Sequence, residues 1–144
     1  MIKPYLFFPY WHWKIPVVLL DRFECVGFHM TDLPFGRGGS PLQNLILRGY
    51  SDTMISAFNV TDEMDAGPVY LKRPLSLDGS AQEIFERASD IIYNDMIPFI
   101  VLNKPIPEPQ VGEVTYFKRI SKDEYPVPAR MWDAYGYKVK VKGN

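Results

Sequence analysis

Residues 25–43 read CVGFHMTDLPFGRGGSPLQ and set out a strand, a loop and a helix in turn. The uncharged run CVGFHM, residues 25–30, is typical of a buried β-strand. A Leu-Pro turn and a Gly-Arg-Gly loop follow, and glycine-rich segments of this kind mark connections between regular elements. Ser40 and Pro41 then form an N-cap and first-turn pair, with apolar residues at helical spacing before Gly49. This order of elements is typical of an α/β protein.

Further elements are predicted on both sides of this unit. Residues 5–8 (YLFF) form an apolar run closed by Pro9, which predicts a strand buried on both faces. The segment IPVVLLDRF begins with Pro16 in its first turn and predicts a short helix. Residues 53–60 and 68–73 have the composition of two more strands, close together in space. We therefore expect an α/β domain with a mostly parallel sheet.

A longer helix is predicted after these strands. Ser80 and Glu83 form a capping box, in which each side chain bonds the backbone N–H of the other residue. Apolar residues recur behind it with the 3.6-residue period of one helix face. These residues are Ile84, Phe85, Ala88, Ile91, Ile92, Met96 and Phe99.

The C-terminal part of the chain has a different composition. Prolines stand at every second position in residues 104–110 (KPIPEPQ) and recur in 125–130 (YPVPAR), which favours extended connectors. Residues 138–142 (KVKVK) place lysines on one face of a predicted strand, where they protect an exposed edge. We therefore expect one folded domain over residues 1–118 and a C-terminal arm or linker over residues 119–144.

Composition excludes several classes of protein. The chain has 144 residues, is 47% hydrophobic and carries a net charge of -1, so no overall positive field would attract nucleic acid or an anionic membrane. Its single cysteine, Cys25, lies in an apolar run and fits a small buried hydrophobe. No uncharged stretch approaches the length of a membrane span, and no secretory signal is recognisable. We expect a cytoplasmic protein.

His29 and Asp65 are the candidate catalytic pair. His29 stands at the carboxyl end of a predicted buried strand, where ligands collect in α/β sheets, and Asp65 follows 36 positions later in MDAGPV. An imidazole can donate a hydrogen bond to an oxygen that gains negative charge in a transition state. A neighbouring carboxylate can orient that ring or relay a proton.

Structural interpretations compete with these roles. A lone histidine at a strand end is usually a structural residue, and Asp65 with Gly67 also fits a turn. Arg37 is more often a solvated loop residue than a ligand contact. The aromatic cluster Tyr10, Trp11 and Trp13 is most simply packing, with stacking on a base or pterin as the rarer alternative. The spacing of Gly36, Gly38 and Gly39 fits neither the P-loop nor the dinucleotide-binding pattern.

The order and spacing of these residues resemble the catalytic domain of the folate-dependent formyltransferases, a family that includes methionyl-tRNA formyltransferases and formyltransferases of nucleotide-linked amino sugars. The family pattern is matched by His29, Leu33, Pro34, Arg37, Gly38, Pro41, Asp65 and Gly67. The resemblance covers residues 4–118. It implies a partial Rossmann-like domain that transfers a formyl group from 10-formyltetrahydrofolate to a primary amine, without a metal.

The resemblance also implies roles for individual residues. His29 and Asp65 would be catalytic. Folate would contact the segment FFPYWHWKIP and the turn around Asp65, through Phe8, Pro9, Trp11, Trp13, Ile15, Pro16, Met64 and Gly67. The acceptor would contact the loop behind His29, through Thr31, Leu33, Pro34, Arg37, Gly38 and Gly39.

Three departures from the family pattern lead to further expectations. Gly27 stands where the family has an asparagine, and Asn44 or Thr31 could substitute for it. The chain begins at the strand of residues 5–8, so half of the family's sheet is expected to be missing and the free edge to form a homo-oligomer. The residues after Lys118 are too few for a tRNA-binding domain, which favours a small amine such as a nucleotide-linked amino sugar. A non-catalytic folate-binding remnant and a formyl-folate hydrolase are the alternatives.

Overall fold

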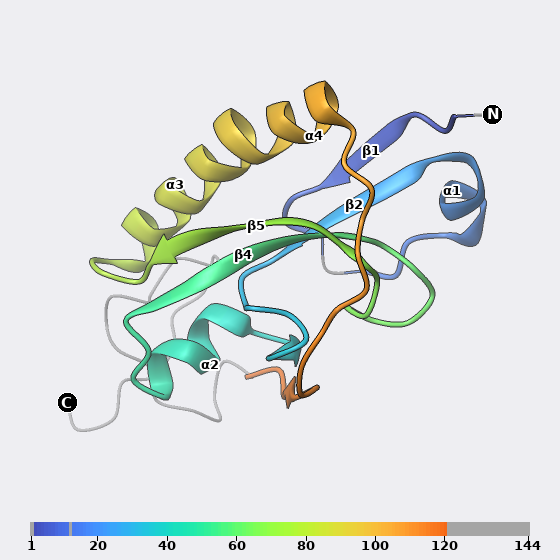
Figure 1. The fold of residues 1–144 in the computed structure, drawn as a ribbon. Helices are drawn as coiled ribbons and strands as arrows, with labels where there is room; N and C mark the ends of the chain where they lie inside the picture. Colours follow the sequence, from blue (N-terminus) through green and yellow to red (C-terminus); the bar gives the residue numbers. More distant parts are fainter. Residues whose placement is uncertain (1, 12, 121–144) are drawn as a thin grey trace.

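The central sheet has four strands in the spatial order β1-β2-β4-β5 (Figure 1). The computed structural model describes residues 2–11 and 13–120. The strands of the central sheet are β1 (Tyr5–Phe8), β2 (Glu24–His29), β4 (Asp52–Asn59) and β5 (Val69–Ser76). All four lie close to the positions that the sequence predicts.

The strand directions make the sheet mixed. β1 and β2 run parallel, with α1 (Val17–Arg22) in the crossover between them. β4 runs antiparallel to both β2 and β5. A second parallel pair is formed by β3 (Arg37–Gly38) and β6 (Tyr116–Phe117). The α/β class is confirmed, and the parallel direction holds for these two pairs, while β4 and β5 form an antiparallel hairpin.

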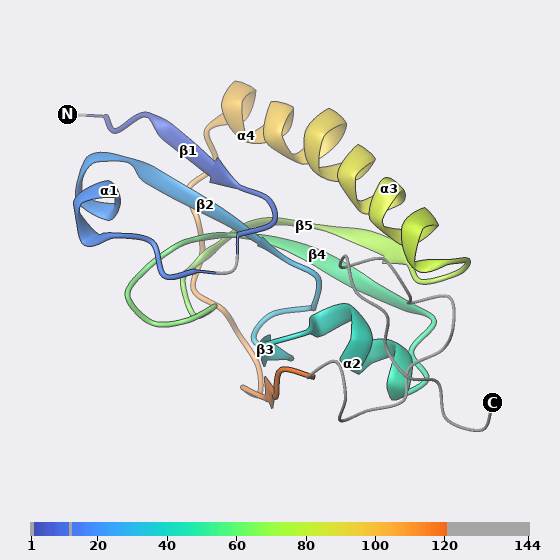
Figure 2. The same ribbon diagram turned by 180° about the vertical axis from the view of Figure 1, so that it is seen from behind.

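Helices lie on both faces of the sheet (Figures 1 and 2). The long helix formed by α3, η1 and α4 covers one face, and α2 (Pro41–Leu47) lies on the other face with the β3–β6 pair. Side chains alternate along a strand, so Val26 and Phe28 face the long helix while Gly27 and His29 face the other side. This alternation places His29 on the face that carries α2 and the β3–β6 pair.

The long helix consists of α3 (Ala81–Ile91), η1 (Ile92–Met96) and α4 (Ile97–Asn103). The predicted capping box is present: the Ser80 hydroxyl accepts from the Glu83 N–H, and the Glu83 carboxylate accepts from the Ser80 N–H. Side chains at every fourth position are fully buried, namely Ile84, Ala88, Ile92, Met96 and Ile100. None of the helices in the described ranges is long and apolar enough to cross a membrane.

The prediction for the end of this helix is wrong at Phe99. Phe99 is 37% exposed, and Ile100 is buried in its place. The reason is the π-helical segment η1, whose wider turn accommodates an extra residue and carries the buried stripe forward. A strict 3.6-residue period therefore stops describing the buried face after η1.

Two local predictions also need correction. Ser40 precedes α2 but makes no side-chain cap; it has a left-handed backbone, with φ 48°, and its hydroxyl accepts from the Ile120 N–H at 3.0 Å. The strand of residues 5–8 is half-buried, because β1 lies at the edge of the sheet and only β2 pairs with it among the described strands. Cys25, in contrast, is buried as predicted, and burial raises the pKa of its thiol.

The chain after the long helix is extended, as the prolines predict. Residues 104–115 contain a single β-bridge, between Glu108 and Val69, before β6 pairs with β3. The chain thereby returns to the face that carries His29. Arg119 and Ile120 still pack beside Gly39 and Ser40. The arm predicted beyond them, with the segments 125–130 and 138–142, lies outside the described residues.

Candidate functional site

His29 ends β2 and projects from the face opposite the long helix. Its Nε2 atom lies 2.8 Å from the Gly36 carbonyl oxygen, and the residue is 8% exposed. A carbonyl oxygen only accepts, so Nε2 must carry the hydrogen and donate. The loop behind the strand thus fixes the ring plane and leaves Nδ1 to face the remainder of the site.

Asp65 approaches from the turn between β4 and β5. Its Oδ2 atom accepts from the Gly38 N–H at 2.9 Å and lies 3.9 Å from His29 Nδ1. Asp65 has a left-handed backbone with φ 53°, a conformation that is uncommon for residues other than glycine. At Gly67 a Cβ atom would lie 1.6 Å from the Asn59 carbonyl oxygen, so only glycine fits there.

The two side chains predicted to be catalytic therefore converge. Their side chains are 9% and 17% exposed, so a charged or polar group placed between them would be largely removed from water. Electrostatic interactions strengthen in such surroundings. The separation of 3.9 Å exceeds a hydrogen bond, and each group keeps capacity for a further partner. An imidazole ring beside a carboxylate can carry out general acid–base chemistry.

Arg37 is held inside the site by internal hydrogen bonds. The sequence alone favours a solvated loop residue or a contact with the acceptor. Its Nε and Nη2 atoms donate to Gln110 Oε1 at 3.2 and 2.9 Å, and Nη1 donates to the Tyr116 hydroxyl at 3.4 Å. Glu63 lies 4.0 Å from Nη1 and is mostly exposed. The residue is 8% exposed, so the guanidinium serves first to join the loop to the C-terminal segment.

Gln110 is a site residue that sequence reasoning misses. Its Nε2 atom donates to the carbonyl oxygens of Asp65 and Gly67, each at 2.8 Å. A glutamine that directly follows a proline-rich connector carries no chemical motif. The only sequence feature that singles out Gln110 is the PIPEP run before it, because prolines restrict the backbone.

The other residues predicted to bind the acceptor mostly build the loop. Thr31 and Leu33 are almost fully buried, and the Thr31 hydroxyl donates to the Gly36 carbonyl at 3.2 Å. The Leu33–Pro34 peptide bond is cis. A Cβ atom at Gly39 would lie 2.7 Å from Arg119 Cβ. Thr31, Leu33 and Pro34 are therefore buried in this structure, while Gly38 and Gly39 are half-buried beside Asp65 and Arg119.

Three of the residues predicted to bind folate form an aromatic ledge beside the site, namely Phe8, Trp11 and Trp13. Phe8 is paired in register with Gly27, two residues before His29. From it, ring contacts lead to Trp11 at 5.9 Å and on to Trp13 at 5.1 Å between centroids. Trp11, Trp13 and, on the other side of the site, Met64 are 51%, 70% and 63% exposed. Pro9 is half-buried, Ile15 is buried and Pro16 is exposed.

Position 27 is enclosed by an aromatic ring. A Cβ atom on Gly27 would lie 2.9 Å from Phe58 Cζ and 3.1 Å from Val60 Cγ2. The Phe58 ring thus takes the space that a side chain at position 27 would need. Neither predicted substitute is free: Asn44 Nδ2 donates to the carbonyls of Gly39, Ser40 and Lys118, and Thr31 is bonded to Gly36.

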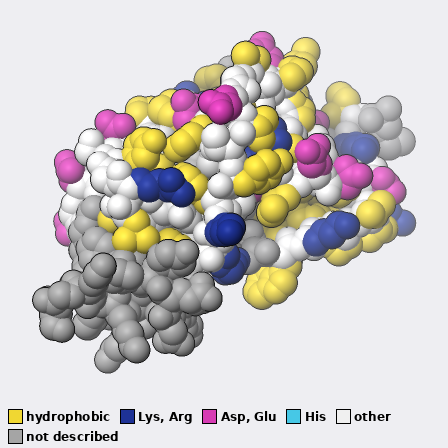
Figure 3. All heavy atoms as spheres, turned by 90° about the horizontal axis from the view of Figure 1, so that it is seen from below, with side chains coloured by type: hydrophobic (Ala, Val, Ile, Leu, Met, Phe, Trp, Pro, Cys, Tyr) yellow, Lys and Arg dark blue, Asp and Glu magenta, His cyan; other side chains and the backbone are white. Residues whose placement is uncertain are grey.

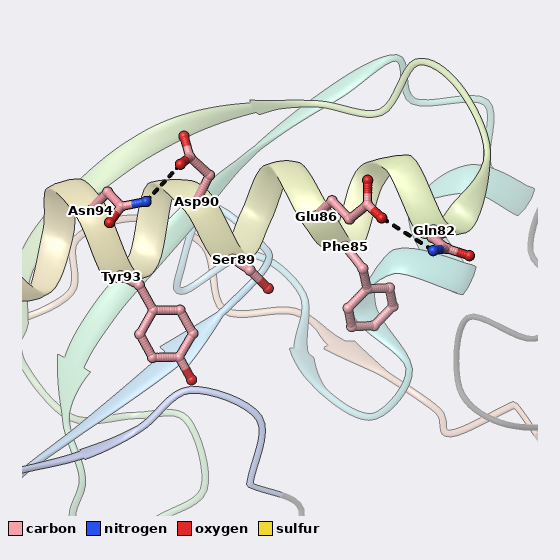
Figure 4. A pocket seen from close by; sticks show the side chains of 7 residues that line it. All are labelled: Gln82, Phe85, Glu86, Ser89, Asp90, Tyr93 and Asn94. Carbon is pink, nitrogen blue, oxygen red and sulfur yellow. Dashed lines mark hydrogen bonds between the residues drawn. The ribbon is translucent and has the colours of Figure 1, made fainter.

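Surface hollows occur away from this site. One of about 470 Å³ follows the outer side of the long helix, where Phe85, Ser89 and Tyr93 project to the same side (Figure 4). The Tyr10 hydroxyl forms a hydrogen bond with Ser89 Oγ at 2.6 Å beside it. A second hollow, of about 550 Å³, lies between the loops that follow α2 and β5. Neither is lined by His29 or Asp65. Among the described residues, no group of three or more His, Cys, Asp and Glu side chains could hold a metal ion.

The sequence is similar to those of methionyl-tRNA formyltransferases. The chain is 32% identical over 114 residues to the methionyl-tRNA formyltransferase of Gluconobacter oxydans, an alignment that covers 76% of this chain and 37% of that protein. The enzyme of Methylococcus capsulatus is 30% identical over a similar region. The chain thus spans little more than a third of the length of these curated relatives. No protein-family profile matches the chain.

Solved structures give the same result for the fold. The methionyl-tRNA formyltransferase from Clostridium thermocellum superposes with a TM-score of 0.86 at 49% identity, over 92% of this chain and 63% of that chain. The formyltransferase PseJ from Anoxybacillus kamchatkensis shares the fold, with a TM-score of 0.64 at 18% identity, over 79% of this chain and 64% of its own. The described residues thus share the Rossmann-like fold of these formyltransferases, with His29 and Asp65 converging behind a Leu-Pro loop.

Proposed function

We propose that this protein transfers a formyl group from 10-formyltetrahydrofolate to a primary amine. The supporting observation is that His29 and Asp65 meet at 3.9 Å in a largely buried site, with Asp65 fixed by the Gly38 N–H. The similar proteins of Gluconobacter oxydans and Clostridium thermocellum are methionyl-tRNA formyltransferases, and the solved structure of PseJ contains tetrahydrofolate.

Each catalytic side chain has a distinct role in this proposal. The donor supplies the formyl carbon: a bond from the amine nitrogen to it forms, its bond to the folate nitrogen breaks, and the proton lost by the amine ends on that nitrogen. Because Gly36 engages His29 Nε2, Nδ1 is the ring atom that faces the substrate, and with both ring nitrogens protonated it would donate to the formyl oxygen as negative charge develops there. Asp65 would orient the ring and accept the proton of the amine.

The aromatic ledge suits a flat heterocycle. Phe8 at the end of β1 and Trp11 and Trp13 in the chain after it present edge-to-face rings, and the two tryptophans are more than half exposed. Aromatic rings favour stacked or edge contacts with other rings. We propose that the pterin ring lies against this ledge, with Pro9, Ile15 and Pro16 beneath it and Met64 and Gly67 on the opposite side.

The test is an assay of tetrahydrofolate release with candidate amines, using Asp65→Asn and His29→Asn. Each substitution is expected to lower kcat on the order of a hundredfold, because each removes a group that interacts with developing charge. Asp62→Asn, an exposed aspartate in the same turn, is the matched control and should keep full activity. No turnover with any amine, together with no folate binding in calorimetry, would reject the proposal.

For the acceptor we propose a small amine such as a nucleotide-linked amino sugar. PseJ is solved in complex with a UDP-linked formamido sugar, and its fold matches this chain. On the face drawn in Figure 3, Lys and Arg side chains lie in separate groups with hydrophobic side chains between them. A tRNA would favour a continuous basic surface. Retention on immobilised tRNA at moderate salt would favour methionyl-tRNA instead.

The surroundings of Gly27 favour a second candidate function. The Phe58 ring leaves no polar side chain at the position where the family pattern has an asparagine. A domain with this change could bind formyl-folate without transferring the group, or pass it to water. Folate binding without turnover would identify the first case, and release of free formate would identify the second.

Two further proposals concern organisation. We place the catalytic domain within residues 1–118 and the arm within 119–144. We also propose that the chain forms a homo-oligomer through β1, whose outer edge has no partner strand among the residues described. Unpaired backbone groups on a strand edge favour pairing with another chain.

A further inference from the structure

Gln110 links three parts of the site through a single amide group. Its Oε1 atom accepts from Arg37 Nε and Nη2, and its Nε2 atom donates to the carbonyl oxygens of Asp65 and Gly67. A glutamine amide has two acceptor sites and two N–H groups, so this arrangement uses its whole capacity. Such a fully bonded amide holds its neighbours in one geometry.

The orientation of this amide is determined by its partners. A guanidinium has only donors and carbonyl oxygens only accept, so Oε1 must face Arg37 and Nε2 must face the turn. The bonds are 2.8–2.9 Å at their shortest. Arg37 is nearly buried, so its guanidinium cannot turn toward water without losing the hydrogen bonds to Gln110. Arg37 thereby fixes the direction in which Gln110 donates.

The turn that receives these bonds needs support. Asp65 adopts φ 53°, which is unfavourable for a residue with a Cβ atom. Gln110 holds its carbonyl oxygen, and the Gly38 N–H holds its carboxylate at 2.9 Å. A small rotation of this turn would alter the 3.9 Å separation between Asp65 Oδ2 and His29 Nδ1.

We infer that Gln110 is a positioning residue, which sets Asp65 against His29 and is itself oriented by Arg37. This inference rests on the proposed function only for its kinetic consequence. The structural part, that Gln110 stabilises the turn bearing Asp65, stands on the hydrogen bonds alone. It also gives Arg37 a role inside the protein in place of a contact with the acceptor.

The decisive variant is Gln110→Glu. It has the same shape and keeps an acceptor for Arg37, but it places an oxygen against the two carbonyls and removes both donated bonds. Gln82→Glu is the matched control, because Gln82 is an exposed glutamine on α3 that bonds only to Glu86 in the described contacts. Thermal unfolding of both variants checks whether the fold is retained.

The first measurement needs no activity. Hydrogen exchange of the Gly38 amide, followed by NMR, reports on its bond to Asp65. The loss of two hydrogen bonds is expected to speed this exchange about tenfold or more in Gln110→Glu and to leave it unchanged in Gln82→Glu. Unchanged exchange in a folded Gln110→Glu protein would overturn the inference. If that variant does not fold, Arg37→Lys decides: it removes the fork and should speed the same exchange.

The second measurement is kinetic. Gln110→Glu is expected to lower kcat at least tenfold with the KM for the folate donor changed less than twofold. In an Asp65→Asn background the same substitution should have no further effect, since Gln110 acts through Asp65. An equal fold-loss in both backgrounds would show that Gln110 acts elsewhere and would overturn the inference. If the unaltered protein shows no turnover, the proposed function fails while the exchange measurement still tests Gln110.

Discussion

Gly27 and Phe58 face each other across neighbouring strands on the side of the sheet that carries His29. The close approach of the Phe58 ring means that the two positions are coupled: a side chain at 27 requires a smaller one at 58. The Phe58 ring fills the space that a polar side chain at position 27 would need. The surroundings of His29 are therefore less polar than the family pattern implies.

Paired substitutions test this coupling. Gly27→Asn is expected to destabilise the protein by about 1–3 kcal/mol, because the new side chain overpacks against Phe58. Phe58→Val alone should be destabilising as well, since it leaves a cavity. The two changes together should cost less than their sum. Urea unfolding of the four proteins measures this, and strict additivity would show that the two side chains do not compete for space.

At the scale of residues, sequence predicts the groups that follow simple rules. His29 is identifiable because it ends an apolar strand, and Asp65 because its spacing from His29 resembles the formyltransferase pattern. Gln110 is not, because its role depends on a long-range approach of residues 104–110 to the turn, and no local pattern encodes that approach. The buried position of Arg37 has the same origin, since Gln110 and Tyr116 supply its partners.

At the scale of elements, the capping box is the best-specified local device. The Ser80 N–H donates to the Glu83 carboxylate, and this bond holds the pKa of Glu83 below its ordinary value near 4.5. A lowered pKa means that the charged form is the one stabilised by folding. Its contribution is complete above the ordinary value and is lost as the pH falls through the lower value of the folded protein.

Substitutions at this cap give a pH-dependent prediction. Ser80→Ala is expected to lower the free energy of unfolding by about 1 kcal/mol at neutral pH. Glu83→Gln should weaken the decrease in stability that the unaltered protein shows between about pH 5 and pH 3. Thermal melts across this range measure both effects. Ser51→Ala, at an exposed serine outside any helix start, is the control. An equally steep acid dependence in Glu83→Gln would contradict the assignment.

Other elements show where local patterns stop being sufficient. Ser40-Pro41 predicts the start of α2 correctly, yet the Ser40 hydroxyl bonds Ile120 from the far end of the domain. The apolar run of β1 predicts a strand correctly but not its half-buried position at the sheet edge. In both cases the local sequence determines the element, and a partner distant in sequence determines its surroundings.

At the scale of the whole molecule, the α/β class followed from the order of elements, but strand direction did not. The turn of residues 60–68 joins β4 to β5 as a hairpin, and the hairpin rule would have indicated an antiparallel pair there. The direction of β4 against β2 depends on how the loop and α2 return the chain, which composition does not encode.

The exposed edge of β1 leads to a prediction about assembly. If two copies pair through this strand, sedimentation should show a dimer whose fraction rises with concentration in the micromolar range. The Glu24 N–H donates to the Pro4 carbonyl, so the backbone groups of Pro4 and Leu6 face β2 and the Tyr5 N–H points to the outer edge. Tyr5→Pro removes this outward N–H and should shift the balance toward monomer. A single monomeric species over the whole range would contradict edge pairing.

The π-helical turn at Ile92–Met96 influences the candidate site without touching it, because it sets the direction of the helix that follows. Each residue advances an α-helix by about 100°. One residue more or less at this turn would therefore swing α4 around its axis and redirect the chain that leaves Asn103 toward Gln110. An insertion at this turn would in this way change the distance between His29 and Asp65 while every residue of the site stays the same.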